Sequence, residues 1–370
     1  MTLPNKATAK FFTGVGQPLE SREYPLPERL EPGAALVQTR LATVCGSDMH
    51  SWRGRRPFPT PSVLGHEGVG TIVRLGEAVT RDAAGRELCE GDRITWTIMA
   101  ACGHCVFCRI HGLPQKCLDL FKYGHAVSDV APYFLGTFGQ YVYLKPGTGI
   151  FKLPAEMPDE TASPLMCAAA TVAAGLDRAT IVPSDTVVIQ GAGMLGLYAA
   201  AFATALGAGQ VIVIDVLDKR LETARRYGAD QVLNARDRSP EDLVEFVREH
   251  TDGFGADLMI EVAGFAAVVE AGVRMLRTGG RYLIQGAVYP NDRFTLQSHD
   301  VITKCLSVYG LHNYGSQHLG MAMDLVHHTP HYSYADLAGP RFPLTVDGVT
   351  DALTALEDRS GIRPIVEPLP

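Results

Sequence analysis

The chain has 370 residues, of which 46% are hydrophobic and 20% are charged. At about 150 residues per domain this length predicts two or three domains, and the hydrophobic residues suffice for a core in each. Length and composition together exclude a disordered chain and a small disulfide-stapled protein. The 33 Lys and Arg residues are outnumbered by 40 Asp and Glu residues, so the net charge is −7 and nucleic acid and anionic membranes are disfavoured as partners. Residues 1–6 lack the apolar core of a signal peptide, and no apolar run approaches the roughly 18 residues of a membrane span. We therefore expect a soluble, cytoplasmic protein.

The first part of the chain has the pattern of a β-rich, loop-heavy domain. Up to about Lys152, short strand-like runs such as Ala35–Leu41 and Val69–Leu75 are interrupted by Gly and Pro. From about Ser184 short apolar runs alternate with helical segments. After about Leu311 the pattern is irregular again, which predicts that the final segment returns to the first domain.

The alternating region predicts a doubly wound parallel sheet. Strands are expected at Thr186–Gln190, Val211–Asp215, Gln231–Leu233, Leu258–Val262, Tyr282–Gln285 and Leu306–Tyr309. Helices are expected at Met194–Leu206, Lys219–Tyr227, Pro240–Glu249 and Ala266–Leu276. Strands and helices that alternate in this way form parallel sheets with right-handed crossovers.

A glycine-rich motif lies between the first predicted strand and the first helix of this region. The motif Gly191-x-Gly193-x-x-Gly196 is weak evidence alone, because an ordinary turn can have the same residues, but here its context agrees. The glycines allow a pyrophosphate to approach the helix N-terminus, where unpaired N–H groups favour an anion. Asp215 ends the next strand, where a carboxylate binds ribose hydroxyls and repels a 2′-phosphate, which favours NAD over NADP. The alternative is a solvated acid at a strand end.

Four of the eight cysteines form one cluster. Cys102, Cys105, Cys108 and Cys117 can surround one Zn²⁺ with no open position, which is typical of a structural site. Incidental free cysteines would be an oxidation liability. A zinc ribbon that binds nucleic acid is a further alternative, but the surroundings lack a basic, aromatic stripe.

Three further candidate ligands are dispersed, and spacing alone does not assemble them. Cys45, His66 and Cys167 would provide two thiolates and one imidazole, leaving a fourth position for water or substrate, as a Lewis-acid zinc requires. By itself, Cys167 in an apolar, Ala-rich stretch is more often a buried core cysteine than a ligand.

Taken together, these motifs resemble the zinc-dependent medium-chain alcohol dehydrogenases over nearly the whole chain. The run Cys45–His50, the element Gly65–Glu67, the four-cysteine lobe, the run Gly136–Tyr141 and the glycine motif occur in that family's order. The resemblance implies a Rossmann doubly wound domain over 169–311 and a β-rich GroES-like catalytic domain over 1–168, with a structural zinc lobe at about 100–118. Residues 312–370 would return to the catalytic domain.

The resemblance also implies a role for individual residues. Cys45, His66 and Cys167 match the catalytic zinc ligands, Glu67 matches a nearby acid that modulates the metal, and Ser47 and His50 match a proton relay through the nicotinamide ribose. The positions matched to the cofactor are Thr171, Gly191, Gly193, Met194, Leu195, Gly196, Asp215, Arg220 and Arg363, the last as a pyrophosphate contact. Eight residues separate Cys108 from Cys117 in this chain, where the family usually has seven before the last cysteine. We expect Cys117 still to bind, because a one-residue extension of the loop costs little entropy.

The expected activity is the reversible, NAD-dependent oxidation of a small-molecule alcohol to an aldehyde or ketone, with two Zn²⁺ per chain. Ser47 would take the hydroxyl proton and pass it through the ribose to His50. The other readings are a non-catalytic dinucleotide-binding protein, which would lack the open-site ligands, and a zinc-ribbon module, which leaves the second half unexplained. A homodimer or homotetramer is also expected.

The substrate prediction depends on Arg56 and Ile98, which match positions that line the substrate pocket. A guanidinium in that pocket would bind a phosphonate, sulfonate or carboxylate, as in a hydroxyalkylphosphonate. The run from Arg53 to Arg56 also resembles dehydrogenases proposed to act in phosphonate catabolism. The alternatives are that these arginines are solvated or hold the cofactor, and that the substrate is an uncharged cyclic or secondary alcohol or a polyol. Polyols rank lower, because the polyol branch commonly has a carboxylate where this chain has Cys167.

Overall fold

The computed structural model describes residues 3–288, 292–358 and 362–369, and its chain divides into two compact units. The first unit comprises Met1–Cys167, Tyr314–Met323 and Ser333–Pro370. The second comprises Ala168–Asn313 and Asp324–Tyr332. Within the described ranges no helix combines the length and the apolar character needed to cross a membrane.

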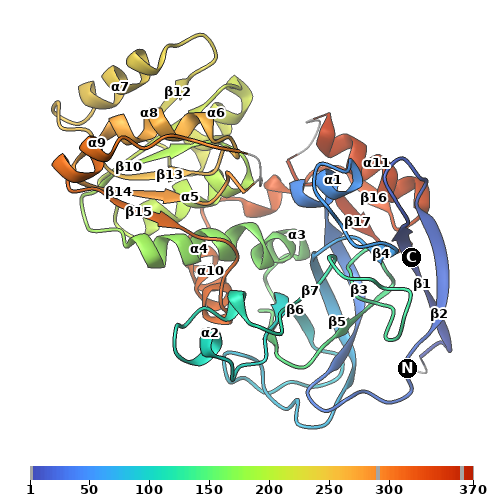
Figure 1. The fold of residues 1–370 in the computed structure, drawn as a ribbon. Helices are drawn as coiled ribbons and strands as arrows, with labels where there is room; N and C mark the ends of the chain where they lie inside the picture. The colour runs from blue at the N-terminus through green and yellow to red at the C-terminus, as the bar shows by residue number, and fades with distance from the viewer. Residues whose placement is uncertain (1–2, 289–291, 359–361, 370) are drawn as a thin grey trace. The chain divides into compact units, whose positions relative to one another are not determined.

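The first unit is built on two sheets (Figure 1). The smaller sheet has the order β2-β1-β4, formed by Glu20–Pro25, Lys6–Phe12 and Ser62–Val63. The larger sheet has the order β16-β17-β3-β5-β6-β7, and β8 and β9 pair with β3 and β6. Its strands are β3 (Ala35–Thr43), β5 (Glu67–Leu75), β6 (Arg93–Ala100), β7 (Phe121–Lys122), β8 (Tyr141–Leu144), β9 (Thr148–Lys152), β16 (Arg341–Pro343) and β17 (Ile365–Glu367). The predicted runs Ala35–Leu41 and Val69–Leu75 lie within β3 and β5 and are confirmed as strands.

Short helices connect these strands. They are α1 (Gly46–Trp52), α2 (Val106–Arg109), α3 (Asp159–Ala162), α11 (Val346–Glu357) and the 3₁₀ turns η1 (Pro114–Lys116), η2 (Ser163–Met166) and η3 (Tyr334–Leu337). The core contains Phe11, Phe12, Phe134 and Phe138, each no more than 1% exposed. Because α1 directly follows β3, the residues around Cys45 are anchored at the end of a buried strand.

The second unit is a six-stranded, wholly parallel sheet with the order β12-β11-β10-β13-β14-β15. The strands are β10 (Thr186–Gln190), β11 (Gln210–Asp215), β12 (Gln231–Asn234), β13 (Ala256–Glu261), β14 (Leu276–Ile284) and β15 (Ser307–Gly310). The helices are α4 (Ala168–Ala179), α5 (Met194–Ala205), α6 (Asp218–Arg226), α7 (Pro240–Glu249), α8 (Ala267–Met275) and α9 (Ser298–Thr303). The strand order reverses direction beside β10, which is the topology of dinucleotide-binding Rossmann domains. The predicted doubly wound sheet is therefore confirmed.

Two features differ from the sequence prediction by more than one or two residues. Strand β14 begins at Leu276, before the predicted start at Tyr282, and a register irregularity against β13 lies in this extra length. The final segment, expected to return as a whole to the first unit, instead crosses between the units along α10 (Ser316–His328). Tyr332 stacks on Tyr227 of the second unit with ring centroids 5.8 Å apart, whereas β17 pairs with β3 of the first.

Candidate active site

The first metal-type cluster begins at the N-terminus of α1. Cys45 precedes this helix, and its backbone N–H donates to Asp48 Oδ2 at 2.9 Å. Asp48 Oδ1 lies 3.0 Å from His66 Nδ1 and accepts the Gly65 N–H at 3.2 Å. Donation of a hydrogen bond from His66 Nδ1–H to Asp48 leaves the Nε2 lone pair to bind a metal ion. Sequence analysis missed Asp48, although its place three residues after Cys45 is the signal of a capping box.

Four side chains from distant parts of the sequence converge beside α1. Ligand atoms of Cys45, His66, Glu67 and Cys167 all lie within 4.8 Å of one another, and the two sulfurs are 3.9 Å apart. The edge of a tetrahedron with Zn–S bonds of about 2.3 Å is about 3.8 Å, and two thiolates with one imidazole are ligands that zinc prefers. Because Arg363 and Thr43 hold the carboxylate of Glu67, the other three residues fit a zinc ion with a fourth position left for substrate.

The electrostatics of this cluster favour a cation. Burial lowers the pKa of His66, but Asp48 and Cys45 outweigh it and raise that pKa to about 10. The hydrogen bond with Cys167 lowers the pKa of Cys45 well below its usual range and raises that of Cys167. A site that attracts protons so strongly through negative neighbours also attracts a metal cation.

Glu67 has a buried counter-charge that sequence analysis did not anticipate. Its Oε1 lies 3.0 Å from Arg363 Nη2, and its Oε2 accepts the Thr43 hydroxyl at 2.6 Å. Burial raises the pKa of Glu67, and Arg363 opposes this shift. Arg363 is 3% exposed, and in the first unit its partner is Glu67. Its predicted contact with a cofactor pyrophosphate stays a prediction.

The predicted relay residues both lie on α1. Ser47 Oγ is 3.3 Å from His66 Nε2, which places a hydroxyl beside the open metal-type cluster. His50 lies one helical turn further on, where its Nδ1 is 3.2 Å from Arg55 Nη1. Burial lowers the pKa of His50, and Arg55 and Arg56 lower it further. The neutral imidazole, which can accept a proton, is thus favoured near neutral pH.

The second metal-type cluster is local in sequence and contains only sulfur. The structure brings Cys102, Cys105, Cys108 and Cys117 together, with Cys105 Sγ 3.5 Å from Cys108 Sγ and 3.9 Å from Cys117 Sγ. Backbone N–H groups point at the sulfurs, among them those of Cys102 and Asp119, which donate to Cys117. Hydrogen bonds from Leu118 and Cys108 lower the pKa of Cys105 to about 6. Four sulfurs gathered in this way fit a closed, structural zinc site.

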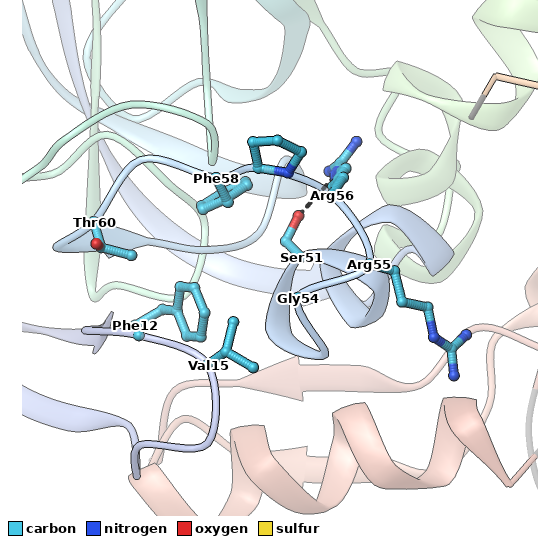
Figure 2. Close-up of a pocket in the computed structure, with 10 residues that line it drawn as sticks. Phe12, Val15, Ser51, Gly54, Arg55, Arg56, Phe58 and Thr60 are labelled. Atoms are coloured by element: carbon cyan, nitrogen blue, oxygen red, sulfur yellow. Dashed lines mark hydrogen bonds between the residues drawn. The ribbon is translucent and has the colours of Figure 1, made fainter. Parts of the chain in front are cut away.

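The three arginines after α1 differ in their contacts. Arg53 and Arg55 form ion pairs with Glu357 of α11. Arg56 turns the other way: Figure 2 shows it beside Ser51, whose Oγ accepts its Nε–H at 2.9 Å, while Arg55 extends toward α11. Sequence analysis could not distinguish these arginines, because Glu357, which binds Arg53 and Arg55, and His125, which contacts Arg56, are distant in the sequence.

A pocket of about 480 Å³ opens beside these arginines (Figure 2). Its lining is Phe12, Gly14, Val15, Ser51, Gly54, Arg55, Arg56, Pro57, Phe58 and Thr60. The other predicted substrate residue, Ile98, is 1% exposed on β6, and its backbone N–H donates to Tyr314 Oη. Its place in a substrate pocket stays a prediction.

In the second unit, the three motif glycines have different roles. Gly191 has a φ of 106°, and a Cβ on Gly196 would lie 1.9 Å from the Gly191 carbonyl oxygen, so the turn itself requires both residues. A Cβ on Gly193 would meet only Arg220 Nη1, at 4.0 Å. The fold does not demand glycine there, at the N-cap of α5, and the open space fits a phosphate that approaches the helix.

Asp215 ties the end of β11 to this glycine turn. Its Oδ2 accepts the Ala192 N–H at 2.7 Å, its Oδ1 accepts the N–H groups of Val216 and Leu217, and Arg220 Nη1 is 4.0 Å away. The other predicted cofactor residues lie on helices of this unit. Met194 and Leu195 open α5, and Thr171 on α4 has its carbonyl bound by Gln285 Nε2 at 2.7 Å. Their contact with a cofactor stays a prediction.

Comparison with known proteins agrees with both units. Residues 31–155 match the model of the alcohol dehydrogenase GroES-like domain, and residues 195–328 match that of the zinc-binding dehydrogenase. The chain is 34% identical over 353 residues to 5-exo-hydroxycamphor dehydrogenase of Pseudomonas putida, covering 94% of this chain and 95% of that protein. It belongs to the zinc-dependent medium-chain dehydrogenase family.

Solved structures of this family support the same assignment. An alcohol dehydrogenase from Thermotoga maritima superposes with a TM-score of 0.93 at 31% identity, over 98% of this chain and 100% of that one. A putative zinc-binding dehydrogenase from Sinorhizobium meliloti, solved with NADP, has a TM-score of 0.85 at 26% identity, over 99% of this chain and 100% of that one. As a zinc-dependent medium-chain dehydrogenase, the chain is an oxidoreductase of the alcohol dehydrogenase type with the expected GroES-like and Rossmann folds.

Proposed function

We propose that this chain catalyses the reversible, zinc- and NAD-dependent oxidation of an alcohol to an aldehyde or ketone. The observation that carries this proposal is the cluster of Cys45, His66 and Cys167, in which Asp48 orients the imidazole and a fourth ligand position is left. A non-catalytic dinucleotide-binding protein has no need of this arrangement. We propose two Zn²⁺ per chain, one in each cluster, and a homodimer or homotetramer, for which the edge strand β15 provides an unpaired side.

The protein residues have separate tasks in this reaction. A zinc ion in the open cluster would polarise the alcohol oxygen and lower the pKa of its hydroxyl. We assign Ser47, whose Oγ lies 3.3 Å from His66 Nε2, to take the proton of the alcohol hydroxyl, and His50, on the same helix, to receive it next. His50, neutral at pH 7, then releases the proton to solvent. A nicotinamide cofactor bound at the glycine turn would supply the hydride acceptor, so that the alcohol would be oxidised as NAD⁺ is reduced.

NAD is proposed as the cofactor because Asp215 ends β11 with its carboxylate beside the glycine turn. The S. meliloti dehydrogenase was solved with NADP, so the preference of this chain for NAD is tested at Asp215. NADH formation with a panel of alcohols should be accompanied by a kcat/KM for NAD⁺ well above that for NADP⁺. Asp215→Ala should narrow this preference by about tenfold, because one hydrogen bond to a charged group is lost. Equal kcat/KM values in the unmutated enzyme would contradict NAD preference.

The proposed substrate is an anionic hydroxy compound, such as a hydroxyalkylphosphonate. Arg56 supports it, because its guanidinium turns toward α1 and donates from Nη2 to the Ser47 carbonyl at 3.0 Å. The second candidate is an uncharged cyclic or secondary alcohol, which the name of the P. putida relative favours. A polyol ranks third. Comparing 2-hydroxyethylphosphonate with uncharged analogues separates these classes, and a protein that binds NAD but forms no NADH with any alcohol would be the non-catalytic alternative.

A further inference from the structure

Glu261, the last residue of β13, is a buried carboxylate that neither the motifs nor the proposed reaction uses. The residue is 0% exposed. Its Oε1 accepts the Gly264 N–H at 2.7 Å, and its Oε2 accepts the N–H groups of Gly286 at 3.0 Å and of Ala287 at 2.8 Å. A carboxylate is costly to bury unless hydrogen bonds satisfy its oxygens, so these three peptide groups stabilise Glu261 in the interior.

The three peptide groups belong to two loops of the second unit. Gly264 lies in the loop that follows β13, and Gly286 and Ala287 lie in the loop that follows β14. The Glu261 carbonyl also accepts the Gly286 N–H, at 3.1 Å. A Cβ on Gly286 would lie 2.8 Å from the Gly264 nitrogen, so the two loops are in direct contact. One side chain therefore holds both loops together.

Both loops lie at the edge of the sheet where a dinucleotide binds. The parallel strands β10, β13 and β14 are neighbours, so their carboxyl ends meet at one edge of the sheet. The glycine turn follows β10 at that edge, and a Cβ on Gly191 would lie 2.8 Å from Ala263 Cα, in the loop after β13. The loop that Glu261 holds is thus packed directly against the glycine turn.

The proposed place of the adenosine leaves these loops to the other half of the cofactor. Asp215, the proposed contact of the adenosine ribose, ends β11 on one side of β10, whereas β13 and β14 lie on the other side. A dinucleotide spans the point where the strand order reverses, with its pyrophosphate at the glycine turn. The nicotinamide half would therefore extend over the carboxyl ends of β13 and β14.

We propose that Glu261 is a positioning residue for the nicotinamide half of the cofactor. This inference rests on the proposed function. Because Glu261 is fully buried, its carboxylate acts through the two loops, which it holds in the conformation that receives the nicotinamide ribose and ring. Loops that are ordered before binding lose less entropy when the ligand binds, so the affinity for the whole cofactor depends on this carboxylate.

Binding of the whole and of a truncated cofactor tests this inference. NADH contains both halves of the dinucleotide, whereas ADP-ribose lacks the nicotinamide. In Glu261→Gln the amide NH₂ group cannot accept a hydrogen bond, so at least one loop loses its acceptor. This variant should weaken NADH binding by at least about tenfold and change ADP-ribose binding by less than about threefold. Glu261→Asp keeps the charge but is shorter by a methylene, and should weaken NADH binding selectively by a smaller factor.

Two further variants control for damage to the sheet and for a general loss of affinity. Asp257→Asn changes another carboxylate of β13, near its amino end, where Asp257 accepts N–H groups of Thr186 and Arg277. Because that end of the strand is remote from the crevice, both dissociation constants should stay unchanged. Asp215→Ala should weaken NADH and ADP-ribose alike, because both ligands contain the adenosine ribose.

Fluorescence titration with NADH and calorimetric titration with ADP-ribose keep this inference separate from the proposed function. If no alcohol is oxidised but Glu261→Gln loses NADH affinity selectively, the proposed function fails and the role of Glu261 stands. If alcohols are oxidised but Glu261→Gln binds NADH normally, or loses affinity for both ligands equally, the role of Glu261 is wrong. If Glu261→Gln does not fold, Glu261→Asp decides by the same criterion. For a chain that binds NADPH instead, NADPH and 2′-phospho-ADP-ribose provide the comparison, and binding of neither dinucleotide would overturn both proposals.

Discussion

The two cysteine clusters of this dehydrogenase are built in opposite ways. Cys102, Cys105, Cys108 and Cys117 come from 16 consecutive residues, and their sulfurs accept mainly backbone N–H groups. The open cluster takes Cys45, His66 and Cys167 from three distant segments, and its partners are side chains such as Asp48. A local cluster depends on its own loop, whereas a dispersed cluster depends on the packing of the whole unit. A zinc ion would therefore stabilise the fold in the four-cysteine cluster and take part in the reaction in the open cluster.

The largest difference should appear when one sulfur is removed from the open cluster. Cys167→Ala should lower kcat by about 1000-fold or more, since a Lewis acid contributes several kcal/mol to such a reaction. Metal analysis should fall from two zinc ions per chain to one, with the four-cysteine lobe still filled. A variant that keeps a substantial fraction of its activity would refute the role of Cys167 as a ligand.

Removing a sulfur from the closed cluster should have the complementary effect. Cys105→Ala should lower Tm by roughly 5 °C or more, because metal binding there contributes to folding. The kcat of the folded fraction should stay within about twofold of the unmutated value, since no substrate position exists in a four-thiolate site. Thermal unfolding with parallel zinc analysis measures both effects. A loss of kcat as large as that of Cys167→Ala would contradict the division of roles.

A smaller loss of activity or zinc affinity should follow when a side chain that contacts a metal ligand is changed. Asp48→Asn keeps the shape of the residue but weakens the contact with His66 Nδ1, and should lower activity or zinc affinity of the open cluster by about 10- to 100-fold. The matched control is Asp119→Asn, because Asp119 contacts Cys117 Sγ through its backbone N–H. Zinc titration of both variants should show no change for Asp119→Asn. An Asp48→Asn variant with unchanged activity and zinc affinity would contradict the role of this carboxylate, and a loss as large in Asp119→Asn would contradict the difference between the clusters.

The smallest expected effect concerns proton transfer, which only the open cluster requires. Burial, Arg55 and Arg56 lower the pKa of His50, against the opposing effects of Cys45 and Glu357. A base accepts protons only when unprotonated, so kcat should fall as the pH drops through this pKa, below the ordinary value of about 6.5. His50→Gln should remove that limb of the pH profile and lower kcat by about tenfold.

Variants of the neighbouring arginines sharpen this prediction. Arg55→Gln removes one cause of the lowered pKa, so the limb should move to higher pH. Arg53→Gln should leave the limb in place, because Arg53 pairs with Glu357 and is not among the charges that lower the pKa of His50. A limb that stays unchanged in His50→Gln would assign the proton acceptor to another group.

The sequence by itself determined the features that depend on short-range spacing. The alternation of apolar runs and helices predicts the parallel sheet, because strands buried on both faces appear as continuous apolar runs and helices buried on one face follow the helical period. The glycine motif and Asp215 are recognisable because one turn joins β10 to α5 and the next strand ends beside it. The four-cysteine lobe is recognisable for the same reason.

Tertiary structure decided the features whose partners lie far apart in the chain. Cys45 and Cys167 are separated by 122 positions. From the sequence, only the resemblance to a family predicted that they bind the same metal ion. The ion pair of Arg363 with Glu67 was not foreseeable, nor was the turn of Arg56 away from Arg53 and Arg55. Side-chain direction depends on which neighbour is packed within reach, and long-range packing leaves no regular period in the sequence.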